Sequence, residues 1–283
     1  MSDPEISIVI VSWNVRDLTL SCLESIDRFV RTSHEVIVVD NHSHDGTVEV
    51  IQQRFPGIQV IANSENFGFA RANNQGWQRS KGRYIVFLNP DTEFIDDPFP
   101  VLINRAQQTG VGCVGPQLLN PDRTYQSSVR RFPRFADQVL VLLKLGRVAK
   151  FIPALRAYQL PVRTSDVQRV EQIMGAAMVL PRTVLTELGC FDEGYWIWFE
   201  EVDLCRRLHQ HGYAIEYVPD GKIIHHGGPS FAQHYSVVKH VWFMKSLARY
   251  VGKYWSPVPR LLLYLLMPIS YILTVGLSLI KPK

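Results

Sequence analysis

The sequence predicts an α/β fold: a mostly parallel, Rossmann-like sheet flanked by helices, followed by an apolar C-terminal helix associated with a membrane. In the first 90 residues, short apolar runs rich in Ile and Val alternate with helical patterns. This spacing is typical of a doubly wound parallel sheet. Several of the runs end directly in polar or acidic residues, and open α/β sheets bind ligands at the carboxyl ends of such strands.

The first half of the chain alternates regularly between strands and helices. The predicted strands are Ile6 to Val11, Glu35 to Asp40, Ile58 to Ala62 and Arg83 to Leu88. Asn14 is of a residue type that caps helices, and apolar residues then recur every four positions from Leu18 to Val30. The later helices are Thr47 to Phe55 and Gly68 to Arg79.

The second half is less regular. We expect strands at Val111–Gly115, Gly175–Pro181 and Tyr213–Val218, and helices at Val139–Ile152 and Phe199–His211. No linker-like stretch divides the first 250 residues. The prediction is therefore one α/β domain over residues 1–233 and a separate C-terminal part over residues 234–283.

The C-terminal part has the pattern of a membrane-binding segment. Leu261 to Ile280 contains no charged residue and has about the length that spans the hydrocarbon core of a bilayer. The preceding stretch, His234 to Trp255, combines basic with apolar and aromatic residues, which suits an anionic membrane surface. We expect attachment to the cytoplasmic face of a membrane, by a spanning helix or by an interfacial one bent at Pro268. The alternative is a buried helix docked on the domain.

The composition argues against several other classes of protein. The net charge of +4 over 283 residues is too small to indicate nucleic-acid binding. The four cysteines lie far apart and form no Cys-x-x-Cys pair. This argues against a zinc site or a disulfide scaffold, and it suits a reducing compartment.

The strand that ends at Leu88 is followed by Asn89, Pro90, Asp91 and, two residues later, Glu93. A carboxylate at this position can hold a hard divalent cation such as Mg2+ or Mn2+, which can neutralise a diphosphate. We therefore take Asp91 as the candidate metal ligand. His225, after a strand and before a Gly-Gly turn, is a second candidate. The alternative for Asp91 is a residue of an ordinary turn, and the alternative for His225 is a structural histidine.

A second group of residues suits a nucleotide. Ser12 and Asn14 follow the first strand, and Asp40 and Asn41 end the second, so adjacent parallel strands bring them to one edge. Asp40 can accept a hydrogen bond from a ribose or a base, or it can be a turn residue. The start of the next helix carries residues suited to binding a base or ribose, which are Asn66, Gly68, Phe69 and Asn73.

A third group suits a sugar acceptor. Trp196 and Trp198 precede three acids, Glu200, Glu201 and Asp203. Sugar rings pack on indoles, and a carboxylate can remove a hydroxyl proton. The alternative is that the acids complement a helix dipole and that Asp203 pairs with Arg207 four residues on.

Seven motifs in order resemble family 2 glycosyltransferases of the GT-A fold, over roughly residues 5 to 232, and most closely their rhamnosyltransferase branch. The motifs are Val-Ser-Trp-Asn14, Val-Val-Asp-Asn41, Asn-Phe-Gly-Phe-Ala70, Phe-Leu-Asn-Pro-Asp91, Gly-Ala-Ala-Met178, Phe-Glu-Glu-Val-Asp-Leu-Cys205 and His-His-Gly-Gly228. The resemblance implies a metal-dependent, inverting transferase with a nucleotide-diphospho-sugar donor. Together with the apolar tail, it also implies that the acceptor is a cell-surface glycan or a lipid-linked saccharide.

The resemblance assigns roles to the same residues. Asp40 would contact the nucleoside, Asp91 the metal, and His225 the metal or diphosphate. Two positions depart from the family pattern, which often has Asp at Asn89 and usually has Glu-Asp at Glu200-Glu201. The general base would then be Glu201, one methylene longer than usual.

The basic residues Arg130 and Arg131 have two interpretations. They contact the diphosphate or an anionic acceptor, or they belong to a solvated basic loop. Three alternatives to the transferase also stay open. They are a polyprenyl-phosphate sugar synthase, a nucleotidyltransferase and a non-catalytic nucleotide-sugar-binding scaffold.

Overall fold

The computed structural model describes residues 3–145, 166–227 and 236–280. Its large sheet has the strand order β3-β2-β1-β4-β11-β6-β12-β5. The strands are β1 (Ile6–Ser12), β2 (His34–Asp40), β3 (Gln59–Ala62), β4 (Tyr84–Leu88), β5 (Thr92–Glu93), β6 (Val111–Leu119), β7 (Tyr125–Gln126), β8 (Val129–Arg130), β9 (Gln168–Val170), β10 (Gln172–Ile173), β11 (Ala177–Pro181) and β12 (Ala214–His225). Of these, β7 pairs with β6, β9 pairs with β12, and β8 and β10 form a separate pair.

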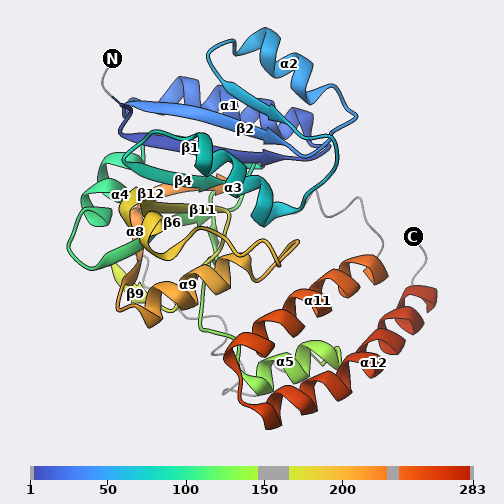
Figure 1. Cartoon of the computed structure of the whole chain (residues 1–283). Helices are drawn as coiled ribbons and strands as arrows, with labels where there is room; N and C mark the ends of the chain where they lie inside the picture. The colour runs from blue at the N-terminus through green and yellow to red at the C-terminus, as the bar shows by residue number, and fades with distance from the viewer. Residues whose placement is uncertain (1–2, 146–165, 228–235, 281–283) are drawn as a thin grey trace.

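The helices surround this sheet (Figure 1). They are α1 (Arg16–Phe29), α2 (Thr47–Arg54), α3 (Phe69–Arg79), α4 (Phe99–Ala106), α5 (Phe135–Leu142), α8 (Arg182–Leu188), α9 (Glu200–Gln210), α11 (Ser236–Tyr254) and α12 (Pro257–Ile280). Figure 1 also shows α5, α11 and α12 grouped together beside the sheet, on the side of α9.

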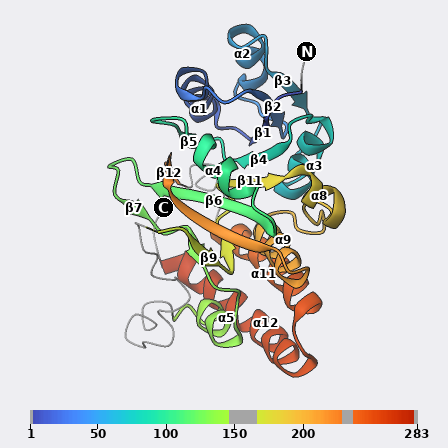
Figure 2. The same ribbon diagram turned by 90° about the vertical axis from the view of Figure 1, so that its left-hand side faces the viewer.

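The predicted parallel arrangement is confirmed for the first half of the chain, where β1 pairs in parallel with β2 and β4, and β2 with β3. The Gly175–Pro181 segment does form a strand, β11, but it runs antiparallel to β4 and β6 (Figure 2). The sheet is thus mixed, with β12 again parallel to β6.

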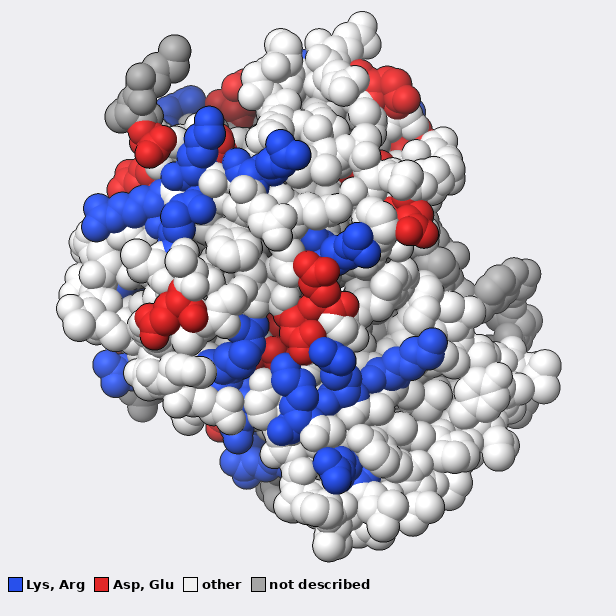
Figure 3. All heavy atoms as spheres, viewed as in Figure 1, with Lys and Arg blue, Asp and Glu red and all other residues white. Residues whose placement is uncertain are grey.

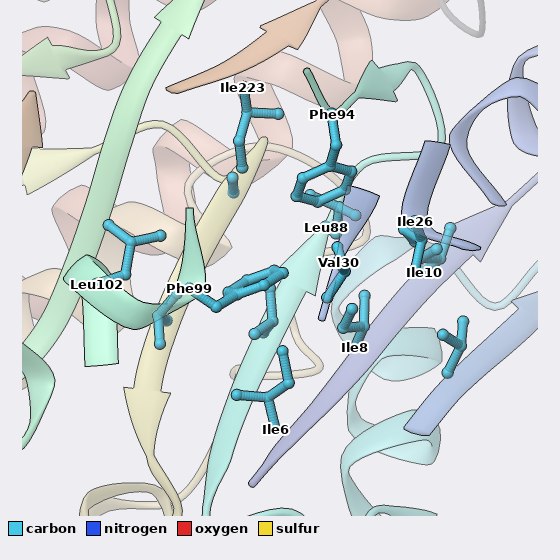
Figure 4. Close-up of a cluster of buried hydrophobic side chains, with 14 of the residues drawn as sticks. Ile6, Ile8, Ile10, Ile26, Val30, Leu88, Phe94, Phe99, Leu102 and Ile223 are labelled. Carbon is cyan, nitrogen blue, oxygen red and sulfur yellow. The ribbon is translucent and has the colours of Figure 1, made fainter. Parts of the chain in front are cut away.

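The core follows from the alternation of side chains along the strands. Ile6, Ile8 and Ile10 of β1 pack on one face of the sheet, against Ile26 of α1 and Phe99 of α4 (Figure 4). The intervening Val9 lies in a second buried cluster on the opposite face, with residues of α3, α8 and α9. Strands with both faces covered are continuously apolar, and all seven β1 residues are buried.

Several predicted details differ in the structure. Asn14 does not cap α1: the helix begins at Arg16, and Asn14 has a left-handed backbone with φ of 51°. Its side-chain oxygen instead accepts a hydrogen bond from the His44 N–H at 2.8 Å. The predicted helix Val139–Ile152 is confirmed only in its first part, because α5 ends at Leu142 and residues 146–152 lie outside the described ranges.

The C-terminal helices share the core of the α/β domain. Leu247, Tyr250 and Val251 of α11 and Leu263 of α12 are buried in the same cluster as Val9 and the α9 residues. The division into residues 1–233 and 234–283 stays a prediction. By length and apolar composition, Pro257–Leu279 of α12 also qualifies as a helix that could cross a membrane.

Candidate active site

A cavity of about 280 Å³ opens where β1, β2 and β4 end, and α9 and α11 contribute to its wall. Twelve of the residues singled out from the sequence line it: Asn41, Asn66, Gly68, Phe69, Asn89, Asp91, Arg130, Trp196, Trp198, Glu200, Glu201 and His225. Ser12, Asn14, Asp40, Asn73 and Asp203 do not. The three groups predicted from separate parts of the chain therefore meet in one place.

Asp91 and His225 lie side by side because β5 pairs with β12. In that pairing His225 is opposite Thr92, and the His226 N–H donates to the Asp91 carbonyl at 2.9 Å. The Asp91 Oδ1 atom is 3.4 Å from His225 Nε2. Both side chains are buried, and Asp91 Oδ1 has no hydrogen-bond partner among the described residues. An orphaned carboxylate oxygen facing an imidazole nitrogen is a donor pair suited to a divalent cation.

Gln126, which was not predicted as a site residue, fixes the ring of His225. His225 Nδ1 is 2.7 Å from Gln126 Oε1. The Gln126 amide nitrogen donates to the His225 carbonyl and to Asn120 Oδ1, both at 3.0 Å. Because both of those partners are carbonyl oxygens, Oε1 is the end of the Gln126 amide that faces His225. The imidazole proton is then on Nδ1, which leaves the Nε2 lone pair directed towards Asp91.

These residues would supply only part of a metal coordination shell. Among the described residues, no group of three or more His, Cys, Asp or Glu side chains is arranged to hold a metal ion. Glu93 pairs with His226 at 3.3 Å and does not line the cavity. Asp91 and His225 therefore fit a cation whose remaining ligands come from a bound diphosphate and water.

Glu200 and Glu201 form the first turn of α9 and reach the cavity together. The two residues before them, Trp198 and Phe199, both have a left-handed backbone, with φ of 62° and 66°. Such conformations are costly for bulky residues and gather at functional sites. Here they turn the chain sharply so that the aromatic rings and both carboxylates face the same space.

The two glutamates differ in their electrostatic surroundings. Burial, and then the negative charge of Glu201, raises the pKa of Glu200 well above its ordinary value. Burial also raises the pKa of Glu201, but a backbone N–H at the start of α9 and then the positive charge of Arg130 oppose that shift. When two close carboxyl groups share a site, one keeps the proton. These opposing effects favour Glu201 as the ionised member of the pair.

The third acid, Asp203, holds two helices together and lies outside the cavity. It is fully buried, and Arg207 donates to its Oδ2 at 2.9 Å, as predicted from the i+4 spacing. Its other oxygen accepts hydrogen bonds from Tyr195, Tyr254 and Lys253. Since Lys253 and Tyr254 belong to α11, Asp203 joins α9 to the C-terminal helices.

The polar residues at the ends of β1 and β2 also meet as predicted, with Ser12 opposite Asp40. Most of their hydrogen bonds are internal. The Ser12 hydroxyl bonds Thr19, and Asp40 Oδ1 accepts from the Ser43 N–H at 2.8 Å. Asp40 Oδ2 is buried without a hydrogen-bond partner among the described residues. Of this group only Asn41 lines the cavity.

The start of α3 is fitted against Trp196. Asn66 Oδ1 accepts from the Gly68 N–H at 2.9 Å, and the Phe69 N–H donates to the Trp196 carbonyl at 2.7 Å. A Cβ atom on Gly68 would be 2.4 Å from that carbonyl, so only glycine fits. Asn73, by contrast, bonds back to the Phe69 carbonyl within the helix.

Trp242 of α11 completes an aromatic wall that was not fully predicted. Its ring centroid is 4.3 Å from that of Trp196, and both line the cavity together with Trp198. The sequence placed Trp242 on a basic helix but gave no reason to direct it towards the acids. The position follows from the packing of Leu247 and Tyr250 on the core.

Comparison with known proteins identifies a family. A family model described as Glycosyl transferase family 2 matches residues 7–158, more than half of the chain. An N-acetylglucosaminyl-diphospho-decaprenol L-rhamnosyltransferase of Mycobacterium tuberculosis is 26% identical over 203 residues, which cover 68% of this chain and 66% of that protein. The rhamnosyltransferase WbbL of Escherichia coli K12 is 26% identical over 255 residues, which cover 87% of this chain and 92% of WbbL. The chain thus spans just under two thirds of the mycobacterial relative.

Solved structures confirm the predicted GT-A fold. A mannosyltransferase from Pyrobaculum calidifontis, in complex with GDP-Man and Mn2+, matches with a TM-score of 0.60 at 16% identity, over 100% of this chain and 77% of that one. GalNAc-T7, solved with UDP, GalNAc and Mn2+, matches with a TM-score of 0.60 at 19% identity, over 79% of this chain and 44% of that one. At these identities the likeness concerns the fold alone.

Proposed function

Because the chain belongs to glycosyl transferase family 2, we propose that it is a metal-dependent, inverting glycosyltransferase. It transfers a sugar from a nucleotide-diphospho-sugar to a saccharide acceptor. One observation carries the proposal: a buried acid and histidine, Asp91 and His225, face the same cavity as the glutamate pair of α9. One side of the cavity is thus suited to a diphosphate and the other to deprotonation of a hydroxyl.

The donor would bind along the edge formed by β1, β4 and the start of α3. Asp91 and His225 would hold Mg2+ or Mn2+, which when bound neutralises the charge on the leaving nucleoside diphosphate. Asn41, Asn66 and Phe69 line the part of the cavity that remains for the nucleoside. Asp40 Oδ2, which has no hydrogen-bond partner in the described part of the chain, belongs to the residue before Asn41 and is suited to accept a hydrogen bond from a base or ribose.

Glu201 would act as the general base. Its carboxylate lines the cavity, and Arg130 favours its ionised form while Glu200 retains a proton. An ionised Glu201 removes the proton from an acceptor hydroxyl, and that oxygen attacks the anomeric carbon on the face opposite the leaving diphosphate. Displacement from the opposite face inverts the anomeric configuration.

The acceptor would lie against Trp196, Trp198 and Trp242. Indole faces bind the apolar faces of sugar rings, and these three line the cavity beside the acids. Trp242 comes from α11, which packs on the apolar helix α12. This arrangement suits an acceptor saccharide carried on a lipid, which is also the kind of substrate that the name of the mycobacterial relative describes.

Rhamnose is the first sugar to test, because two of the similar proteins are rhamnosyltransferases. The experiment is a screen of dTDP-, UDP- and GDP-sugars for release of a nucleoside diphosphate, with a disaccharide acceptor, in Mn2+ and in EDTA. Metal-dependent release of a nucleoside diphosphate with formation of a longer saccharide supports the proposal.

The same screen separates the alternatives. Release of pyrophosphate indicates a nucleotidyltransferase, and transfer to a polyprenyl phosphate indicates a polyprenyl-phosphate sugar synthase. Donor binding without turnover, over all donors and acceptors tried, indicates a nucleotide-sugar-binding scaffold. Each of these three results contradicts the proposed reaction.

A further inference from the structure

We infer that α12 lies in the plane of a membrane, embedded in one leaflet, and does not cross the bilayer. The inference deepens the membrane attachment expected from the sequence, but it depends on how α12 packs and not on the reaction. Its partner is a lipid bilayer that carries anionic headgroups. The arguments are the polarity of the two faces of α12, its attachment to α11, and the charges that α11 carries.

The two faces of α12 have the opposite polarity to those of a helix on the surface of a soluble protein. The side facing the protein buries Ser270 and Thr274 together with Leu263. The outward side exposes large apolar residues, among them Leu265 at 63%, Ile272 at 69% and Leu279 at 82%. The surface over α12, at the lower right of Figure 3, is correspondingly almost free of charged residues. A contiguous exposed apolar face of this kind marks a site that binds a protein or a membrane, and its residue pattern suits lipid.

Three hydrogen bonds fasten α12 along α11 in antiparallel register. Arg260 donates to the Gly252 carbonyl at 3.3 Å, and Tyr264 donates to the Ala248 carbonyl at 3.1 Å. Farther along, the Ser270 hydroxyl is 2.8 Å from His240 Nε2. As the residue number rises on α12 it falls on α11, so the two helices lie side by side from Arg260 to Ser270.

The Ser270 contact belongs to a chain of hydrogen bonds through three helices. Lys144 Nζ is 3.1 Å from His240 Nδ1, and the Ser270 hydroxyl donates onward to the Leu142 carbonyl at 2.6 Å. Because Ser270 uses its proton for that carbonyl, it accepts from His240 Nε2–H, and His240 Nδ1 accepts from the lysine. The chain fixes the middle of α12 to both α5 and α11.

A crossing helix is incompatible with this attachment. The hydrogen bonds to α11 and α5 hold α12 from Arg260 to Ser270, and the ten residues from there to Ile280 span only about 15 Å at 1.5 Å per residue, half of a core of about 30 Å. If α12 stood upright, α11 would stand beside it and would carry Lys245, Arg249 and Lys253 towards the hydrocarbon. Charged side chains there are costly. With α12 lying flat, Arg249 and Lys253 keep their ion pairs with Asp192 and Asp203 outside the hydrocarbon. The exposed Lys245 then lies on the headgroup side, where anionic lipid attracts it.

The first test is binding of the full chain to vesicles that contain phosphatidylglycerol, measured by co-sedimentation. Leu265→Glu and Ile272→Glu should each weaken the partition by about tenfold or more, since each replaces a lipid-facing side chain with a charge. Val167→Glu is the matched control. Val167 is also an exposed apolar residue, at 40%, but it directly precedes β9 and is not part of α12. It should bind vesicles as the unaltered chain does.

Equal binding by all three variants would overturn the inference. So would a full chain that binds no vesicles and self-associates through α12, with Ile272→Glu dissociating it. Transfer to a water-soluble acceptor should persist in both α12 variants. In the unaltered chain, transfer without vesicle binding contradicts only this inference, and vesicle binding without transfer contradicts only the proposed reaction.

The second test distinguishes a flat helix from a crossing one. Ser256→Cys and Ser278→Cys place a thiol just before α12 and near its end, and the native cysteines are all buried. Membrane vesicles with the α/β domain outside are loaded with a membrane-impermeant maleimide in the lumen. A helix in the outer leaflet predicts labelling of neither position. Labelling of Ser278→Cys from the lumen would show that α12 crosses and would overturn the inference.

Discussion

Gln126 and His225 are joined by a 2.7 Å hydrogen bond that fixes the imidazole as its Nδ1–H tautomer and directs Nε2 towards Asp91. The residue that orients the ring comes from β7, about 100 positions earlier in the chain than the histidine. A contact of this type raises the basicity of a metal-ligating histidine and holds its ring in place.

Replacing Gln126 should therefore weaken metal binding before it affects anything else. For Gln126→Leu we expect the affinity for Mn2+ to fall by about 10- to 100-fold, the usual scale for such outer contacts. The Kd for Mn2+ can be read by electron paramagnetic resonance with a bound nucleoside diphosphate and without turnover. Gln126→Glu keeps an acceptor for Nδ1–H and is the matched control, with a smaller loss. An unchanged Mn2+ affinity in Gln126→Leu would refute this role.

The glutamate pair should separate binding from chemistry. Glu201→Gln should bind donor normally but lose about 100-fold or more in kcat, the usual contribution of a general base. Glu200→Gln should be milder, because the raised pKa of Glu200 favours its protonated form, which the amide resembles. Donor affinity and single-turnover rates measure the two effects independently. A larger loss in Glu200→Gln would assign the base to Glu200.

The pH dependence of the rate should depend on Arg130. Burial raises the pKa of Glu201, so the active, ionised form is lost as the pH falls through a value above the usual carboxyl range. Arg130→Gln removes the opposing positive charge and raises that pKa further. The acidic limb of the kcat/KM profile should then move to higher pH. Lys222→Gln, an exposed position outside the cavity, should leave the limb in place, and an unmoved limb in Arg130→Gln would contradict the assignment.

Asp203 should be needed for stability. Asp203→Ala leaves Arg207 and Lys253 without their buried partner, and we expect the free energy of unfolding to fall by about 3 kcal/mol, as when a buried ion pair is broken. Urea denaturation measures this. Arg249→Ala, which breaks an exposed pair with Asp192, is the control and should cost about 1 kcal/mol or less. A variant at Asp203 that is fully stable but inactive would place this acid in the chemistry instead.

Local sequence patterns were sufficient for the first half of the fold. Buried parallel strands are continuously apolar, so β1, β2 and β4 could be located within a residue or two from their Ile and Val content. The antiparallel direction of β11 and the short strand β5 could not, because both depend on pairing between segments far apart in the chain. β5 in particular consists of two residues, Thr92 and Glu93.

The candidate site was predictable where chemistry marks the residue and not where packing does. Asp91, Glu201 and His225 stand out as acids and a histidine at element ends, and all three reach the cavity. Gln126 and Trp242 carry no such mark, since an amide in a two-residue strand and an aromatic residue on a helix have many uses. Asp40 and Asp203 have the right type and position, yet their oxygens are engaged mainly by neighbouring protein groups.

The central claim is that Asp91 supports metal-dependent transfer of a sugar with inversion. It is tested most directly by following donor and acceptor by proton NMR in the presence of Mg2+, with the unaltered chain and with Asp91→Asn, whose side chain is nearly the same size. Mn2+, which broadens the spectrum, is left out. Glu93→Gln, outside the cavity, is the control. We predict a product of opposite anomeric configuration, formed with a nucleoside diphosphate by the unaltered chain and by Glu93→Gln, and none in Asp91→Asn or in EDTA. A product of retained configuration, or undiminished turnover in Asp91→Asn, would contradict the account.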